Sequence, residues 1–164
     1  MIVLGVDPGT VTAGYGVVER PDAGPIRLVE CGVIRPPRAA LAERLDGIFS
    51  ELEALISRHR PDVIAVEAVF VAHNARSALV LGHARGVILL AVARAGVALA
   101  EYAPRDVKAA VVGTGSATKP QIQLMVAKLL RLKTAPEPTD AADGVAIALT
   151  HCLRTRTLRR AKVG

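Results

Sequence analysis

The sequence is poor in aromatic residues, in cysteine and in long apolar runs. Only two Phe and two Tyr occur among 164 residues, and there is no Trp, so the core must be built from aliphatic side chains. The two cysteines, Cys31 and Cys152, form no CxxC pair, which argues against a disulfide framework and against a zinc site. The richest apolar run, Val87 to Val92, is closed off by arginines and is too short to cross a bilayer. We therefore expect no membrane association.

The chain length and its first residues suit one cytoplasmic domain. Ile2 to Val6 reads as a strand, and no basic region followed by a long apolar stretch precedes it, so no secretory signal is expected. A length of 164 residues and a mean hydropathy of +0.37 allow a substantial core. Residues 1–153 are predicted to form the single domain, and residues 154–164 a basic, flexible C-terminal tail.

The net charge of +6 is unevenly distributed along the chain. Residues 1–69 carry seven basic and ten acidic residues, whereas residues 70–133 carry nine basic and two acidic residues. A basic middle in a chain with an acidic N-terminal part indicates a surface that faces a polyanion, although a solvated basic face would give the same pattern.

Apolar periodicity predicts a mixed five-stranded sheet flanked by helices, an α/β fold. Three strand-like runs come first, and helices and strands alternate after them. The strands are expected at 2–6, 14–19, 28–34, 63–66 and 97–102. The helices are expected at 38–59, 74–95, 118–132 and 139–153, with a helical turn from Arg105.

Four carboxylates fall where such a fold could bring them together. Asp7 and Glu67 each follow a hydrophobic strand, and both would emerge at one edge of the sheet if those strands were parallel neighbours. Asp140 and Asp143 are three residues apart on a helix and so share a face. Each acid also has a plainer explanation, because turns, strand ends and first helical turns commonly carry acids.

A pocket of four carboxylates would be costly without cations to neutralise it. Ligation by oxygen alone suits Mg²⁺ or Mn²⁺, and two such ions can activate a water and stabilise the leaving oxygen in phosphodiester cleavage. The spacing therefore predicts a divalent-metal site at Asp7, Glu67, Asp140 and Asp143.

Two further residues are candidates for contact with a nucleic acid. Lys119 begins a helix, where the dipole disfavours a cation unless an anion such as phosphate shares the site. Phe70 follows Glu67 by three residues, so its ring could stack on an unpaired base, or it could simply belong to the core.

The runs GVDPGTVTAGYGVV, AVEAVFVAHNARSALVLGHARGV, VVGTGSATKPQIQLMV and TDAADGVAIALTHC resemble the RuvC family of Holliday junction resolvases, in the order of that family. The resemblance implies a ribonuclease H-like fold, a homodimer and Mg²⁺-dependent endonuclease activity that resolves four-way DNA junctions by paired symmetric nicks in recombination and repair. Asp7, Glu67, Asp140 and Asp143 match the catalytic acids of the family. Lys108 and Lys119 match its basic positions near the scissile backbone, and Phe70 matches an aromatic implicated in stacking.

The same resemblance suggests two ions per subunit, with Mn²⁺ able to replace Mg²⁺, and a branch-migration motor as a partner. The small residues Ala75, Ala78, Gly82 and Gly86 share one helix face, which could approach a second subunit or the sheet of the same chain.

Two alternative functions stay open. The opening GVDPGT also resembles a phosphate-binding loop of sugar-kinase or actin-like phosphotransferases, although 164 residues leave little room for their two lobes. A non-catalytic junction-binding protein is the second.

Overall fold

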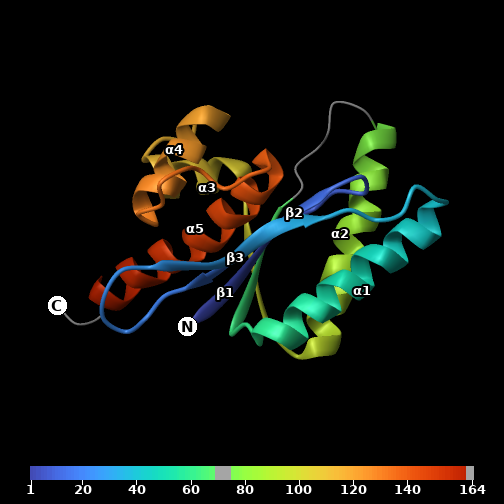
Figure 1. Ribbon diagram of the computed structural model, residues 1–164, viewed down its shortest axis with the longest axis horizontal. Helices are drawn as coiled ribbons and strands as arrows, with labels where there is room; N and C mark the ends of the chain where they lie inside the picture. Colours follow the sequence, from blue (N-terminus) through green and yellow to red (C-terminus); the bar gives the residue numbers. More distant parts are fainter. Residues whose placement is uncertain (69–74, 162–164) are drawn as a thin grey trace.

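The five strands form one mixed sheet, as the sequence predicts (Figure 1). The structure is a computed structural model that describes residues 1–68 and 75–161. Its strands are β1 (Ile2–Asp7), β2 (Ala13–Glu19), β3 (Arg27–Ile34), β4 (Val63–Glu67) and β5 (Ala98–Tyr102). They lie in the order β3-β2-β1-β4-β5. β1 is antiparallel to β2 and parallel to β4, and β4 is parallel to β5. The antiparallel part therefore joins the parallel part at the central strand, β1.

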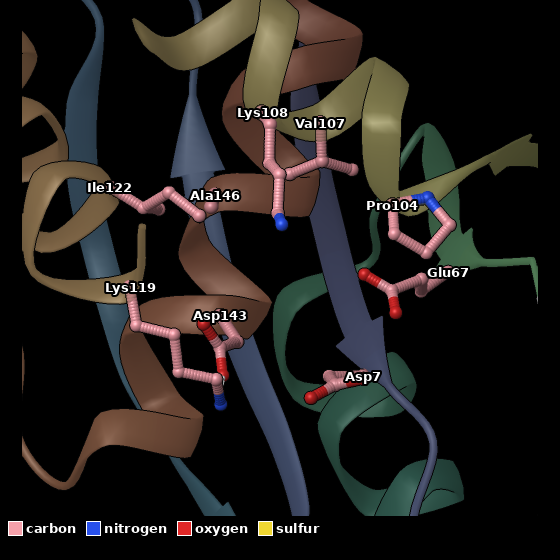
Figure 2. A pocket seen from close by; sticks show the side chains of 9 residues that line it. All are labelled: Asp7, Glu67, Pro104, Val107, Lys108, Lys119, Ile122, Asp143 and Ala146. Atoms are coloured by element: carbon pink, nitrogen blue, oxygen red, sulfur yellow. Dashed lines mark hydrogen bonds and ion pairs between the residues drawn. The ribbon is translucent and has the colours of Figure 1, made fainter. Parts of the chain in front are cut away.

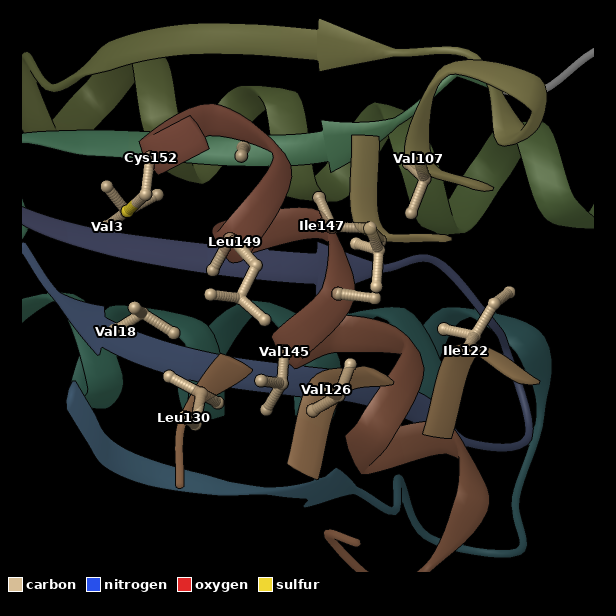
Figure 3. Close-up of a cluster of buried hydrophobic side chains, with 14 of the residues drawn as sticks. Val3, Val18, Val107, Ile122, Val126, Leu130, Val145, Ile147, Leu149 and Cys152 are labelled. Atoms are coloured by element: carbon tan, nitrogen blue, oxygen red, sulfur yellow. The ribbon is translucent and has the colours of Figure 1, made fainter. Parts of the chain in front are cut away.

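Helices cover both faces of this sheet (Figure 1). They are α1 (Leu41–His59), α2 (Ala75–Ala95), α3 (Pro104–Val112), α4 (Lys119–Leu129) and α5 (Thr139–Ala161). The alternation of side chains along β1 divides the core in two. Val3 packs in one cluster with α3, α4 and α5 (Figure 3), whereas Leu4 and Val6 pack in the other with α1 and α2. The sheet is thus buried on both faces, which explains the nearly continuous apolar run of β1.

Glycines allow α5 to lie directly on β1 and β2. A Cβ at Gly14 of β2 would stand 1.8 Å from the carbonyl oxygen of Asp140, and a Cβ at Gly144 of α5 would stand 2.5 Å from Tyr15 Cα. Neither position can hold a larger residue without displacing backbone. This close packing fixes the first turns of α5, which carry two of the candidate acids, against the sheet.

Two of the predicted helical segments are longer in the structure. The last helix was expected to end near Leu153, but α5 continues to Ala161. The helix gains polar contacts beyond Leu153, because Arg154 pairs with Asp106 at 2.7 Å and the Thr155 hydroxyl donates to the His151 carbonyl. The turn expected from Arg105 is the nine-residue helix α3, which begins with Pro104 in its first turn. The division at residue 153 into a domain and a flexible tail stays a prediction.

α2 is a long apolar helix, and much of its surface is exposed in the structure. The stretch Ser77–Ala95 is long and apolar enough to cross a membrane, and 22% of it is buried in the structure. A single helix of this kind is weak evidence for a span, because length and composition are the only criteria that it meets. Leu79 and Leu90 are 63% and 53% exposed on it. A large apolar surface of α2 therefore lies open in the single chain.

Candidate active site

Two of the candidate acids meet at the carboxyl ends of the parallel strands β1 and β4. The pairing of Val6 with Val66 places Asp7 beside Glu67, one residue further along each strand. Both side chains are only partly exposed. Strand ends of this kind are where open α/β sheets hold their ligands. The expectation that these two strands are parallel neighbours is confirmed.

Three helices complete a cavity of about 240 Å³ around these acids. Its charged lining residues are Asp7, Glu67, Asp143 of α5, Lys108 of α3 and Lys119 of α4. Figure 2 shows the Lys108 side chain reaching toward the acids from α3, and Lys119 lying beside Asp143. Five of the seven predicted site residues therefore line one cavity, although they come from five different elements.

Burial and mutual repulsion perturb the carboxylates. Burial, followed by the charges of Glu67 and Asp143, raises the pKa of Asp7 from its usual 3.8 to about 7. Burial also raises the pKa of Glu67, with the charge of Asp143 as the next cause. Lys119 opposes both shifts. The cavity thus favours an added positive charge, since a cation would compensate the negative charge that burial and repulsion disfavour on Asp7 and Glu67.

Lys119 is held between its helix and the acids. Its Nζ donates a hydrogen bond to Asp143 Oδ2 at 3.0 Å, and this bond is the first cause that raises the pKa of the lysine. The capping arrangement predicted from the sequence is present, because Gln121 Oε1 accepts from the backbone N–H of Thr118 at 2.8 Å. An ammonium at this helix start is therefore stabilised by a carboxylate of α5.

Of the remaining two candidates, Asp140 and Phe70, the structure describes only Asp140. Asp140 does not line the cavity, although its charge contributes to the raised pKa of Asp7. Its backbone oxygen lies against Gly14 at the base of α5. Phe70 lies outside the described residues.

The donor set fits a divalent cation by charge and by chemistry, since hard ions such as Mg²⁺ prefer carboxylate oxygens. Within residues 1–68 and 75–161, no three His, Cys, Asp or Glu side chains converge closely enough to hold one ion together. Asp143 instead accepts the hydrogen bond from Lys119. Coordination by three acids at once would therefore require side-chain rotation, with Asp143 turning from the ammonium toward the ion.

The apolar walls of the cavity were not singled out from the sequence. They are Pro104, Val107, Ile122 and Ala146, from the helices α3, α4 and α5. Val107 and Ile122 are each 5% exposed and belong to the same core cluster. Helical periodicity marks such residues as buried, but the same signal is given by any core position, so it could not assign them to a site.

Comparisons with known proteins identify the family to which this chain belongs. The model of the family "Crossover junction endodeoxyribonuclease RuvC" matches residues 3–151. The chain is 53% identical over 150 residues to the crossover junction endodeoxyribonuclease RuvC of Halorhodospira halophila, covering 91% of this chain and 88% of that protein.

Two solved structures superpose closely on this chain. A structure of Thermus thermophilus RuvC superposes with a TM-score of 0.87 at 38% identity, covering 96% of each chain. The T. thermophilus RuvC in complex with a Holliday junction substrate superposes with a TM-score of 0.86 at 36% identity, again over 96% of each chain. The expected ribonuclease H-like fold is confirmed. With the family match spanning nearly the whole chain, this protein belongs to the RuvC family of crossover junction endodeoxyribonucleases.

Proposed function

We propose that this protein is a Mg²⁺-dependent endodeoxyribonuclease that resolves four-way (Holliday) DNA junctions by paired symmetric nicks. The observation that carries the proposal is the cavity at the ends of β1 and β4, where Asp7, Glu67 and Asp143 meet two lysines in a chain of the RuvC family. The nicks would fall in strands of like polarity and leave 5′-phosphate and 3′-hydroxyl ends. The reaction would serve homologous recombination and DNA repair.

Asp7, Glu67, Asp140 and Asp143 are the residues proposed to hold the metal, as two Mg²⁺ ions per subunit for which Mn²⁺ can substitute. When bound, such ions activate a water and stabilise the leaving oxygen of an in-line displacement. Asp7 is the acid best placed to serve both ions, because the charges of Glu67, Asp143 and Asp140 all act on it. Bound cations would compensate the burial and the repulsion that raise its pKa to about 7.

Lys119 and Lys108 are proposed to hold the scissile phosphate. Lys108 lines the cavity, and its charge lowers the pKa of Glu67, so its ammonium acts at the ends of the strands. Lys119 would exchange part of its contact with Asp143 for a phosphate oxygen as Asp143 turns to the metal. Stacking of Phe70 on a base at the junction centre stays part of the proposal.

The exposed face of α2 supports a homodimer. A Cβ at Gly82 or at Gly86 would meet nothing within 4 Å, so these two glycines do not serve close packing against the sheet of the same chain. With Leu79 and Leu90 also exposed, this helix offers small and apolar residues to a second subunit. Two subunits would supply the two nicks. A cytoplasmic location and a branch-migration motor as partner belong to the same proposal.

The alternative activities are less well supported. A sugar-kinase or actin-like phosphotransferase has two lobes, whereas the described residues form a single five-stranded sheet. A purely binding protein would not need three acids around one cavity.

A cleavage assay tests the proposed function. The purified protein should nick a mobile four-way junction at symmetric positions with Mg²⁺, and should leave a linear duplex of the same sequence intact. Asp7→Asn should bind the junction but not cut it, whereas Asp46→Asn, an exposed acid on α1, should cut at the wild-type rate. Cleavage by Asp7→Asn at that rate would refute the mechanism.

A further inference from the structure

A second cavity lies on the α1 side of the same end of the sheet. It measures about 550 Å³ and is bounded by the loop between β1 and β2, the segment between β3 and α1, and the first turn of α1. Arg35, Arg38 and Arg44 all line it, and no acidic residue does. These arginines lie within residues 35–44, a locally basic segment of the otherwise acidic residues 1–69, and the fold places this segment against the β1–β2 loop.

The three guanidinium groups differ in what they bind. Arg44 Nε and one terminal nitrogen donate to the Thr10 carbonyl oxygen at 2.9 and 2.5 Å, which fixes Arg44 to the β1–β2 loop. Arg35 and Arg38 are exposed, and neither forms a hydrogen bond or ion pair with any residue of the described ranges.

Four arginines elsewhere in the chain do pair with acids. Arg27, Arg58, Arg85 and Arg154 each pair with a carboxylate. Like-charged groups gathered without a counter-ion repel one another, so a cavity of this composition favours an anion. The threonines Thr10 and Thr12 also line it and add hydroxyl groups that can donate to phosphate oxygens.

The backbone at the mouth of the cavity adds to the positive electrostatic potential of the arginines. α1 begins after Ala40, and no side chain caps its first N–H groups, so the positive end of the helix dipole is not compensated there. Pro36 and Pro37 restrict the segment that carries the two exposed arginines. The lining contains no aromatic side chain and no Asn or Gln, which are the groups that stack on bases or read adenine edges. Its arginines and threonines suit phosphate oxygens.

The position of this cavity relates it to the acidic one. Thr10 lines the arginine-containing cavity and Asp7 lines the acidic cavity, and three residues of chain separate their Cα atoms by at most about 11 Å. The arginine-containing cavity faces α1, and the acidic cavity is closed by α3, α4 and α5. A strand in the acidic cavity can therefore reach the arginines within one turn of a duplex, about 34 Å, by passing around the β1–β2 loop.

We propose that this cavity, with Arg35 and Arg38 as its contact residues, binds the phosphodiester backbone of a DNA arm that leaves the acidic cavity across the β1–β2 loop. The inference rests on the proposed function, since it assumes a DNA substrate at the acids. Because α1 and the three helices around the acidic cavity cover opposite faces of the sheet, a straight duplex cannot follow both cavities as directly as a branched or sharply bent one. The arginines would thus favour four-way junctions over linear DNA. Arg44 acts as a positioning residue, because two of its nitrogens already hold the loop.

Salt-dependent binding to a four-way junction, in EDTA to prevent cleavage, tests this proposal. Each phosphate contact contributes a slope of about 0.9 to the plot of log affinity against log salt. Arg35→Gln/Arg38→Gln should therefore lower the slope by about 1.8 for each occupied cavity, which makes the loss of affinity between 50 and 200 mM salt roughly 12-fold smaller. Arg35→Lys/Arg38→Lys should restore the slope, because the charge is kept.

The matched control removes two arginines from the opposite end of the sheet. Arg27 begins β3 and Arg60 follows the end of α1, where its φ of 44° is one that Asn tolerates. Arg27→Gln/Arg60→Asn changes the net charge equally, and melting temperatures of all variants check folding.

A slope of Arg35→Gln/Arg38→Gln equal to that of the control would overturn the proposal, as would equal losses for a four-way junction and for a linear duplex. Failure of the wild-type protein to bind junctions at all would instead refute the proposed function. The two failures are therefore distinguishable. Loss of the slope with the Gln pair and its return with the Lys pair support the inference.

Discussion

Replacement of Asp7 by Asn should stabilise the protein in the absence of divalent metal while it abolishes cleavage. The pKa of Asp7 is raised from 3.8 to about 7, mainly by burial. The folded protein thus holds a proton on Asp7 that the unfolded chain has already lost, and stability falls as the pH rises from about 4 through 7. At 1.36 kcal/mol for each unit, the cost of Asp7 to folding is about 2 kcal/mol at pH 5 and about 4 kcal/mol at pH 8.

Asn carries no charge at either pH, so Asp7→Asn should escape this cost. In EDTA at pH 8 its melting temperature should exceed that of the wild type by roughly 10 °C, since 1 kcal/mol corresponds to about 2–4 °C in a domain of this size. At pH 5 the difference should be about half as large. Because the chain has no Trp, circular dichroism at 222 nm is the suitable probe.

Addition of Mg²⁺ should remove most of the difference in stability between the two proteins. A ligand at 100 times its dissociation constant stabilises the folded state by about 2.7 kcal/mol, and only the wild type keeps the full set of acids. Asp46→Asn serves as the control, because Asp46 is exposed on α1. Equal melting temperatures of Asp7→Asn and wild type at pH 8 in EDTA would refute the account of burial and repulsion. An equal response to Mg²⁺ would refute the assignment of Asp7 to the metal.

Three further perturbations follow from single contacts. Lys119→Met should slow single-turnover cleavage by about 10²–10³-fold with junction affinity changed only a few-fold, and a wild-type rate would contradict its role at the phosphate. Gly14→Ala should lower the melting temperature, because its Cβ would meet the Asp140 carbonyl at a cost of about 1–3 kcal/mol, whereas Gly82→Ala, in open space, should not. Leu79→Glu should give a monomer by sedimentation velocity if α2 forms the dimer interface, while Leu124→Glu, at an exposed apolar position on α4, should keep the wild-type state.

Much of the local structure could be predicted from the sequence. Period-two and period-3.6 patterns placed the strands and the long helices within a few residues of their observed bounds, because apolar periodicity reports directly which face is buried. The end of α5 was placed too early, at Leu153 instead of Ala161, because the polar contacts of Arg154 and Thr155 are tertiary or specific to one turn and leave no apolar pattern. α3 was underestimated for a similar reason, since only nine residues form it.

The sequence by itself determined that Asp7 and Glu67 end strands, that Lys119 begins a helix and that four motifs follow the order of one family. Only the tertiary structure decided which of these groups meet. Strand order made β1 and β4 parallel neighbours, and glycine contacts set α5 close enough to bring in Asp143. Folding also placed Arg35 and Arg38, three residues apart in the sequence, beside the β1–β2 loop. Charge along a chain is a sum, whereas the electrostatic field of a cavity depends on which side chains the packing brings together.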